Sequence, residues 1–532
     1  MSRPLLSLCL IVRDEEAMLP DLLTALGDLP DEICAVDTGS TDGTVALLEA
    51  AGARVRRIAW ADDFAAARNA ALDMARGDWI LSLDADERPS PDLVTAIRAV
   101  TRDPGAGAAT VRLVDELPGG ARRTTRLLRL WRRDPSIRFR HRIHEDATAA
   151  VAAFLERTGL AVRHLPGTLR HLGYRRDVAA ARAKKERDRR LLEAAVAEDP
   201  RDWYSWYKLL ELARFWNDHE LWREVTARVL AELRAAGPAA LAGFRFAGDL
   251  VVLLGQGCCR TPAEELEFLE GWRDALLDSP EYRFRRGLLR EITGDLAGAR
   301  RDYTVGLRLP APALEQLSTV RPLLGLARVA ALEGDWREAL SLADAALAEN
   351  PLDPEALLAA VTAAHHAGDL DRWLADHTAR HGRTPELLAA LGEYHLAAGR
   401  WQAARAVLAE AVAAGAGPAA ADRLARARLA AGDLDGARAT AAAAMAEHPP
   451  AALGVLVCDL AAGHDLDLDV EIDAETADSA LREWLDVLWR SRRTDLMTGF
   501  VERMGMVTDH FPWLADHLQE KTRELREQAP RR

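Results

Sequence analysis

The chain has 532 residues and a mass of 58.2 kDa, with 49% hydrophobic and 29% charged residues. Its formal net charge of -14 and its pI near 5.6 disfavour a protein that binds nucleic acid over a broad surface. A chain of this length is too long for one hydrophobic core, so roughly two to four domains are expected.

The cysteines and the lengths of the apolar runs predict the cellular compartment of the protein. Its five cysteines form no CxxC pair and stand mostly in apolar runs, which is typical of thiols in a reducing compartment. The N-terminus lacks the pattern of a signal peptide, and no apolar run approaches the roughly 18 residues of a membrane span. We therefore expect a cytoplasmic protein without a transmembrane segment.

Short apolar runs alternate with helix-length segments over the first part of the chain. The runs, each a candidate strand, are 5–12, 31–37, 53–59, 78–84 and 108–114. Nearly continuous apolar strands separated by helices indicate βαβ units and a sheet that is covered on both faces. Residues 1–175 are therefore predicted to form an α/β domain with a Rossmann-like, mostly parallel sheet.

The chain changes character near residue 180, where Ala, Leu, Arg and Glu at helical spacing replace the strand pattern. A helix rich in Arg and Lys over 176–198 is predicted to link the first domain to an all-α region. Aromatic side chains recur there at helical intervals and are expected to pack between helices rather than to form a ligand cage. They are Trp203, Trp206, Tyr207, Trp216 and Trp222.

Glycine-led turns divide the all-α region at regular intervals. Gly-Asp or Gly-Arg pairs begin at positions 31 to 40 residues apart, namely 294, 334, 368, 399 and 432. Such a period with a glycine turn is what a helix-turn-helix solenoid produces. Residues 199–450 resemble tetratricopeptide (TPR) repeats, of which 323–356 is the unit that matches well. Residues 451–532 keep a helical pattern without such turns and are predicted to form a helical C-terminal cap.

Acidic residues follow three of the predicted strands. They stand in "RDEE" (13–16), "VDTGSTDGT" (36–44) and "DADE" (84–87). In open α/β sheets ligands bind outside the carboxyl ends of the strands, so these acids are expected to line one crevice. Asp37 either bonds the amides of its own loop or accepts a base N–H or a ribose hydroxyl. The glycine pattern is not GxGxxG and no Walker lysine follows, which argues against a Rossmann dehydrogenase and a P-loop enzyme.

Four motifs occur in order within the first 90 residues: "LSLCLIVRDEEAMLPDLLTAL", "VDTGSTDGT", "ADDFAAARNAAL" and "GDWILSLDADE". Together they resemble the family 2 glycosyltransferases, which have the GT-A fold. The resemblance implies a nucleotide-diphosphate sugar donor, with Asp37 on the base and Arg68 and Glu15 at the donor. It also implies a DxD pair at a metal ion, and Asp84 and Asp86 match that pair.

Two positions depart from the usual motifs of this family. Asp14 stands where an Asn commonly precedes two glutamates, and Thr38 stands where a second Asp commonly follows the first. These departures concern the recognition of the donor rather than the fold.

The three acids of "DADE" crowd together and need a positive partner, because neighbouring carboxylates repel one another. A diphosphate leaving group also develops negative charge, and Mn²⁺ or Mg²⁺ bound by one or two carboxylates neutralises such charge. We therefore predict that Asp84 and Asp86 hold a divalent cation and that Asp84 also contacts the donor. A solvated acid in a loop fits Glu87 better, and its role is left open.

Arginines are concentrated in "RRTTRLLRLWRRDPSIRFRHRIHEDA" (122–147), with nine between Arg122 and Arg142. They either hold a diphosphate or an anionic acceptor, or form a solvated β-ribbon, and nucleic acid is a weaker third interpretation. The segment ends in candidates for the general base that an inverting transfer needs. By resemblance to the family we predict Glu145 as the base, with Asp146 as the next candidate.

Two histidines complete the predicted site. Members of the family that carry TPR repeats resemble this chain further, with a His-Glu pair at His144 and Glu145 and a later "RHLGY" that contains His171. His144 and His171 are each either a further metal or phosphate ligand or a structural histidine.

The sequence thus predicts a metal-dependent glycosyltransferase for hexosyl or related transfer, inverting like most of its family, although retention is left open. The concave surface of a solenoid binds extended peptides, so a peptide or protein acceptor is the specific hypothesis and a cell-envelope glycan the alternative. A TPR adaptor with an inactive, nucleotide-sugar-binding domain is a rival. A nucleotidyl transferase is disfavoured because "RDEE" is not a glycine-rich, lysine-containing loop.

Overall fold

The computed structural model describes residues 5–116, 122–172, 178–309, 320–464 and 474–493, together with single positions between 496 and 519. By internal contacts the chain divides into two compact units, Met1–Ser318 and Thr319–Arg532, so the division falls inside the predicted repeat region. Among the helices described, none combines the length and the apolar character that crossing a membrane needs.

The first unit begins with a mixed sheet that contains the predicted strands. The strands are β1 (Leu6–Val12), β2 (Glu32–Asp37), β3 (Arg54–Arg57), β4 (Trp79–Ser82), β5 (Glu87–Pro89), β6 (Ala106–Glu116), β7 (Arg122–Arg132), β8 (Ala161–His164) and β9 (Leu169–His171). Their order is β3-β2-β1-β4-β7-β6-β9-β5, and β8 pairs with β6. Strands β3, β2, β1 and β4 are parallel, whereas β7 is antiparallel to β4 and β6. A parallel Rossmann-like half continued by a mixed half is the GT-A fold, so the predicted fold class is confirmed.

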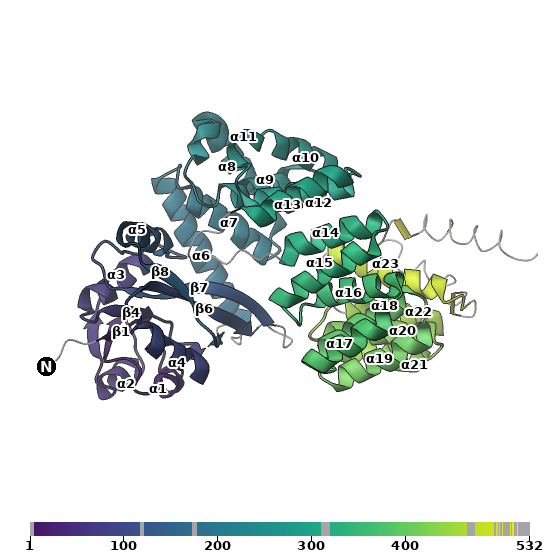
Figure 1. The fold of residues 1–532 in the computed structure, drawn as a ribbon, viewed down its shortest axis with the longest axis horizontal. Helices are drawn as coiled ribbons and strands as arrows, with labels where there is room; N and C mark the ends of the chain where they lie inside the picture. The colour runs from purple at the N-terminus through teal and green to yellow at the C-terminus, as the bar shows by residue number, and fades with distance from the viewer. Residues whose placement is uncertain are drawn as a thin grey trace, which may run out of the picture. The chain divides into compact units, whose positions relative to one another are not determined.

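Helices cover both faces of this sheet (Figure 1). They are α1 (Leu19–Leu26), α2 (Thr44–Ala50), α3 (Phe64–Met74), α4 (Pro91–Val100) and α5 (Thr148–Thr158). Side chains alternate along a strand, so Leu8 and Leu10 of β1 pack with α1 and α4, whereas Cys9 packs with α3 and α5. The two resulting apolar clusters explain why β1 is apolar at every position except Ser7.

The second part of the first unit is helical. Its elements are α6 (Val178–Glu198), α7 (Trp203–Phe215), α8 (His219–Ala236), a 3₁₀ turn (Pro238–Leu241), α9 (Ala247–Cys258), α10 (Pro262–Glu270), α11 (Arg273–Leu276), α12 (Pro280–Ile292) and α13 (Leu296–Arg308). The predicted aromatic packing is found, since Trp203, Trp206 and Tyr207 belong to the core and Trp216 and Trp222 pack against it.

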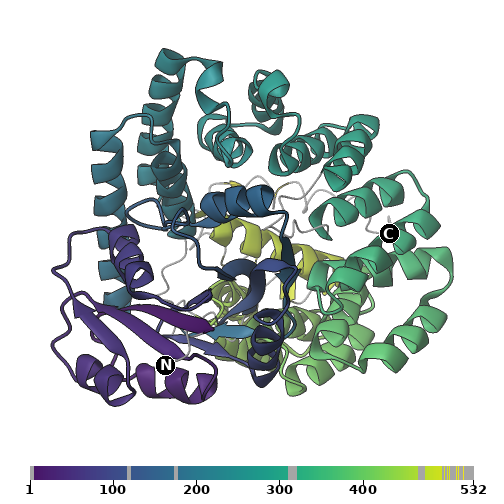
Figure 2. The same cartoon turned by 60° about the vertical axis from the view of Figure 1, so that its left-hand side comes forward.

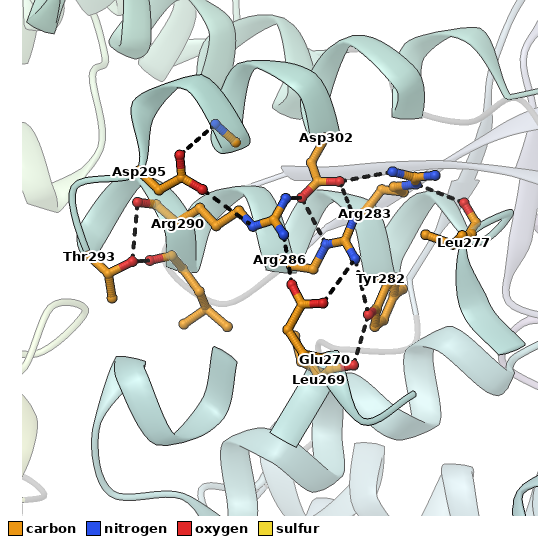
Figure 3. A network of polar contacts seen from close by, with 12 residues as sticks. Leu269, Glu270, Leu277, Tyr282, Arg283, Arg286, Arg290, Thr293, Asp295 and Asp302 are labelled. Atoms are coloured by element: carbon orange, nitrogen blue, oxygen red, sulfur yellow. Dashed lines mark hydrogen bonds and ion pairs between the residues drawn. The ribbon is translucent and has the colours of Figure 1, made fainter. Parts of the chain in front are cut away.

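A buried ion-pair network joins α12 to α13 (Figure 3). Asp302 is 1% exposed and accepts hydrogen bonds from Arg283, Arg286 and Arg290 at 2.5 to 3.0 Å. Glu270 of α10 contacts the outer nitrogens of Arg286 and Arg290 at 3.7 and 2.7 Å. A buried carboxylate with this many guanidinium partners fixes how the helices register against each other.

The glycine turns lie where the sequence predicts them. Each follows the first helix of a pair, with φ between 70° and 90° at Gly294, Gly334, Gly368, Gly399 and Gly432. This left-handed backbone ends a helix and suits glycine because it has no Cβ. Asp295, Asp335 and Asp433 then cap the next helix, as Asp335 does by accepting from Glu338 N at 3.0 Å, whereas Asp369 makes no such side-chain bond. At these three turns the glycine therefore ends one helix and the aspartate begins the next.

The second unit consists of the helix pairs that these turns create, seen from two sides in Figures 1 and 2. The helices are α14 (Val320–Leu332), α15 (Trp336–Glu349), α16 (Pro354–Ala367), α17 (Leu370–His381), α18 (Pro385–Ala397), α19 (Trp401–Ala413), α20 (Pro418–Ala430), α21 (Leu434–Ala444), α22 (Ala451–Ala462) and α23 (Ala474–Arg490). Buried alanines such as Ala343 and Ala360 let neighbouring helices approach closely. These pairs confirm the prediction of TPR-like repeats.

Candidate active site

The parallel strands deliver acidic residues to one edge of the sheet. Strands β2, β1 and β4 are neighbours that run in the same direction, so the loops after them meet at their carboxyl ends. The first two loops are fastened together, because Asp14 Oδ1 accepts from Thr41 N at 2.7 Å and Glu16 Oε2 accepts from Gly43 N at 2.8 Å. The rim predicted from the sequence is therefore formed by the fold.

Asp37 ends β2 and is 3% exposed. Its carboxylate accepts the amides of Ser40 at 3.1 Å and Gly39 at 3.4 Å, which is the loop-bonding alternative. Glu15 precedes the turn that leads into α1, and its carbonyl accepts the amides of Met18 and Leu19. The predicted contacts of Asp37 and Glu15 with a donor remain predictions.

Arg68 brings together residues from three separate motifs. It lies on the buried face of α3 and is 6% exposed. Its Nη2 donates to Asp84 Oδ1 at 2.7 Å, its Nε donates to Glu145 Oε1 at 2.5 Å, and its guanidinium lies 5.5 Å from the centre of the Phe139 ring. A buried guanidinium with two carboxylate partners fixes both of them in orientation.

A second arginine, which sequence reasoning missed, is a further positive partner of these carboxylates. Arg129 of β7 forms ion pairs with Glu87 Oε1 and, at 3.4 Å, with Asp84 Oδ2. Glu87 is fully buried and its Oε2 accepts from Asp84 N at 3.0 Å, so it is not the solvated loop acid expected from the sequence. The positive partners of Asp84 and Glu87 in the structure are guanidinium groups.

The pKa values of Asp84 and Glu87 shift in opposite directions in this environment. Burial opposes ionisation of Asp84, but Arg68 and Arg129 outweigh it and lower the pKa of Asp84 to about 2. Burial is the largest influence on Glu87 and raises its pKa above the ordinary value despite the nearby Arg129. The two arginines thus favour the charged form of Asp84, whereas burial disfavours the charged form of Glu87.

Asp86 and His171 form a second, separate pair. Strand β5 is antiparallel to β9, and Glu87 lies opposite His171 in the register. This pairing brings His171 Nε2 within 3.4 Å of Asp86 Oδ2, and Leu172 N donates to the Asp86 carbonyl at 3.1 Å. A carboxylate beside an imidazole fits Mn²⁺ better than Mg²⁺, because Mg²⁺ prefers oxygen ligands alone.

The predicted metal roles of Asp84 and His144 stay predictions, and the charge of His171 also acts on Asp84. Asp84 is engaged by Arg68 and Arg129, as described above. His144 has a left-handed backbone with φ of 53°, and its carbonyl accepts from Tyr204 Oη at 2.6 Å on α7. Across the described residues no group of three or more His, Cys, Asp or Glu side chains is placed to hold a metal ion.

The two predicted bases face different surroundings. Glu145 meets Arg68 beside Asp84, as given above. Asp146 accepts from Thr148 N at 3.1 Å, where α5 begins, and its Oδ2 lies 3.3 Å from Arg245 Nη1. Glu145 is thus the carboxylate at the rim, and Asp146 has structural partners.

A cleft lies next to this pair, within the first unit. Its volume is about 760 Å³, and its lining comes from α3, the segment after β7, and the junction of α6 with α7. Asp146, Arg140, Arg201 and Tyr204 are among the lining residues, whereas Asp37, Asp84, Asp86 and His171 are not. The cleft therefore opens beside Asp146 and away from the DxD turn.

Known proteins resemble the chain in both of its parts. Residues 7–155 match the model of glycosyl transferase family 2. A TPR repeat-containing protein of Synechococcus elongatus is 42% identical over 206 residues, which cover 38% of this chain and 51% of that protein. An uncharacterized glycosyltransferase of Rickettsia felis is 33% identical over 95 residues, which cover 18% of this chain and 33% of that protein.

A solved structure with some likeness is glucosyl-3-phosphoglycerate synthase from Mycobacterium tuberculosis in complex with Mn²⁺ and UDP-glucose. It is 18% identical, has a TM-score of 0.25, and covers 34% of this chain and 74% of that one. A score this low adds nothing to the fold, which rests on the strand order itself.

Residues 7–155 are a glycosyltransferase family 2 domain, and TPR-like helix pairs follow it in the same chain. The matched segments span about half of the Synechococcus protein and a third of the Rickettsia protein, so the relatives extend well beyond them.

Proposed function

We propose that the protein is a metal-dependent, inverting glycosyltransferase that moves a sugar from a nucleotide-diphosphate sugar to an acceptor. The observation that carries the proposal is the arrangement around Arg68. One buried side chain of a family 2 domain holds Asp84 of the DxD motif and Glu145 at the same sheet edge.

Glu145 is proposed to be the general base. An acceptor hydroxyl attacks the anomeric carbon, its proton passes to the Glu145 carboxylate, and the bond from that carbon to the diphosphate oxygen breaks. Arg68 fixes the orientation of this carboxylate through the 2.5 Å hydrogen bond from Nε. Asp37 is proposed to receive the nucleotide base, with Glu15 nearby at the same rim.

Asp86 and His171 are the residues proposed to hold Mn²⁺ or Mg²⁺. Their side chains lie 3.4 Å apart and combine a carboxylate oxygen with an imidazole nitrogen. A divalent cation held there neutralises the negative charge that develops on the diphosphate leaving group.

The acceptor is proposed to be a peptide or protein that the TPR-like repeats help to bind. Solenoids of helix pairs present extended surfaces for chain-like partners. The cleft beside Asp146 offers room for an acceptor, with exposed Arg140 and Arg201 among its lining residues, whereas Glu145 is not one of them.

A thermal-shift panel of UDP-, GDP- and dTDP-sugars with Mn²⁺ tests the donor and the cation together. We expect one of them to stabilise the wild type and Asp92→Ala, which removes an exposed acid on α4, but not Asp86→Ala. If no nucleotide sugar stabilises the wild type, the proposal fails. Hydrolysis of the stabilising donor, lost in Asp84→Ala, then separates an enzyme from an inactive binding domain.

A further inference from the structure

The loop that carries Glu145 has an unusual backbone. His141 and His144 adopt left-handed conformations, with φ of 70° and 53°, on either side of Ile143. A non-glycine residue in this region costs on the order of 1–3 kcal/mol and persists only where its surroundings enforce it. Something outside the loop must therefore hold it.

The holding contacts come from the bundle of α6, α7, α8 and α9. The Ile143 side chain is 5% exposed and lies in the apolar core of this bundle, not in either core of the sheet. The His141 ring stacks on the Tyr204 ring with centroids 3.8 Å apart. His141 and Ile143 of the loop are thus both packed against the bundle.

Tyr204 also makes a polar contact with the residue just before the base. Its Oη donates to the His144 carbonyl at 2.6 Å, and burial raises the pKa of Tyr204, so the hydroxyl keeps the proton that it donates. That carbonyl belongs to the peptide group that joins His144 to Glu145. The hydrogen bond therefore fixes the rotation of the peptide from which the Glu145 side chain extends.

Further polar contacts close the loop. Arg140 and Asp146 exchange backbone hydrogen bonds of 3.0 and 3.1 Å. Arg245, just before α9, contacts Asp146 at 3.3 Å, and Glu198 at the end of α6 pairs with Arg142 at 2.8 Å. Residues on both sides of Glu145 are therefore tied to the bundle.

We propose that the helical bundle α6–α9 is part of the active site, and that Tyr204 is a positioning residue for Glu145. The inference rests on the proposed function in one respect only, the role of Glu145 as the base. It gives the first helices after the catalytic domain a role in the chemistry, separate from any binding of an acceptor by the repeats.

Tyr204→Phe tests the proposal, because it keeps the ring and its stacking and removes only the hydroxyl. Tyr207→Phe is the matched control: Tyr207 is equally buried on the same helix, and its hydroxyl bonds Glu211 within that helix. Amide hydrogen exchange reads the loop directly. We expect the bonded amides of Arg140 and Asp146 to exchange faster in Tyr204→Phe and at the wild-type rate in Tyr207→Phe; equal exchange in all three proteins overturns the proposal.

The effect on catalysis is measured as the kcat of UDP-glucose hydrolysis with Mn²⁺, and UDP affinity is measured by calorimetry. We expect kcat to fall about tenfold or more in Tyr204→Phe, since small misplacements of a catalytic group are costly, while UDP affinity and Tm stay unchanged. An unchanged kcat shows that the contact is merely structural and overturns the proposal. If the wild type neither binds UDP nor hydrolyses UDP-glucose, that donor is wrong for the proposed function, and the exchange measurement still decides whether Tyr204 holds the loop.

Discussion

Arg68 and Glu145 stand 77 positions apart in the chain, yet Arg68 Nε donates to Glu145 Oε1 at 2.5 Å. The same guanidinium donates to Asp84 at 2.7 Å. One buried cation therefore couples the proposed base to the DxD turn. A substitution of Arg68 is expected to affect both Glu145 and Asp84. The predictions below begin from that coupling.

Arg68→Met is expected to lower the free energy of unfolding by about 3–5 kcal/mol, because it leaves the carboxylates of Asp84 and Glu145 without their shared partner. Urea unfolding measured by circular dichroism gives the value. Arg138→Met is the control, since its 2.8 Å pair with Asp73 has side chains 43% and 53% exposed and is worth about 0–1 kcal/mol. Equal losses of unfolding free energy in the two variants would show that the buried ion pairs of Arg68 stabilise the protein no more than the exposed pair of Arg138 does.

Glu145→Gln is expected to reduce turnover of the nucleotide sugar by about 10²–10⁴-fold, since the amide cannot accept the acceptor's proton. Asp146→Asn should cost much less, because the structure commits Asp146 to Thr148 and Arg245. Steady-state kinetics with donor affinity measured in parallel separate chemistry from binding. The assignment of the base is reversed if Asp146→Asn proves the more damaging change.

The parts of the fold that local chemistry determines were predictable from the sequence. The mostly apolar runs at 5–12, 31–37 and 78–84 became strands β1, β2 and β4, and each Gly-Asp or Gly-Arg pair became a turn between two helices. The same holds for the acids at the strand ends, because parallel neighbouring strands bring their carboxyl ends together whatever the details of packing.

The partners of those acids were not predictable, because they depend on pairing between distant segments. Glu87 meets Arg129 only because β4 pairs with β7, and Asp86 meets His171 only because β5 pairs with β9. One signal was present, since Arg129 is the charged position inside the apolar run "LLRLW". Tyr204 carried none, since an aromatic residue at helical spacing predicts a core position, which it also occupies.

Two glycine-to-alanine substitutions, one at a turn and one inside a helix, are predicted to change stability in opposite directions. Gly334→Ala is expected to destabilise the protein by about 1–2 kcal/mol, because φ is 84° there, although nothing lies within 4 Å of the added Cβ. Gly306→Ala, inside α13, is expected to stabilise it by about 0.4–1 kcal/mol, because the added Cβ meets only Arg283 Cβ at 3.7 Å. Thermal unfolding of both variants measures the two shifts, and shifts of the same sign would contradict the turn assignment.

Asp249 in the first turn of α9 makes stability depend on pH. Burial first, and then the charge of Glu281, raise the pKa of Asp249 to about 6, with a further contribution from Glu211 and an opposing one from Lys208. An aspartate in the unfolded chain titrates near about 4, so the folded state holds the proton more tightly. The stability linked to this group is therefore fully present below about pH 4 and is lost as the pH rises through about 6.

Asp249→Asn removes this titration, because the amide stays neutral at every pH. We expect the variant to be more stable than the wild type by about 1–3 kcal/mol near pH 7.5 and to match it near pH 4. Urea unfolding at the two pH values measures the difference, and Asp274→Asn, which changes an exposed carboxylate on the short helix α11, serves as the control. A stability gain of the same size at both pH values would instead reflect a better helix start and would remove Asp249 as the titrating group.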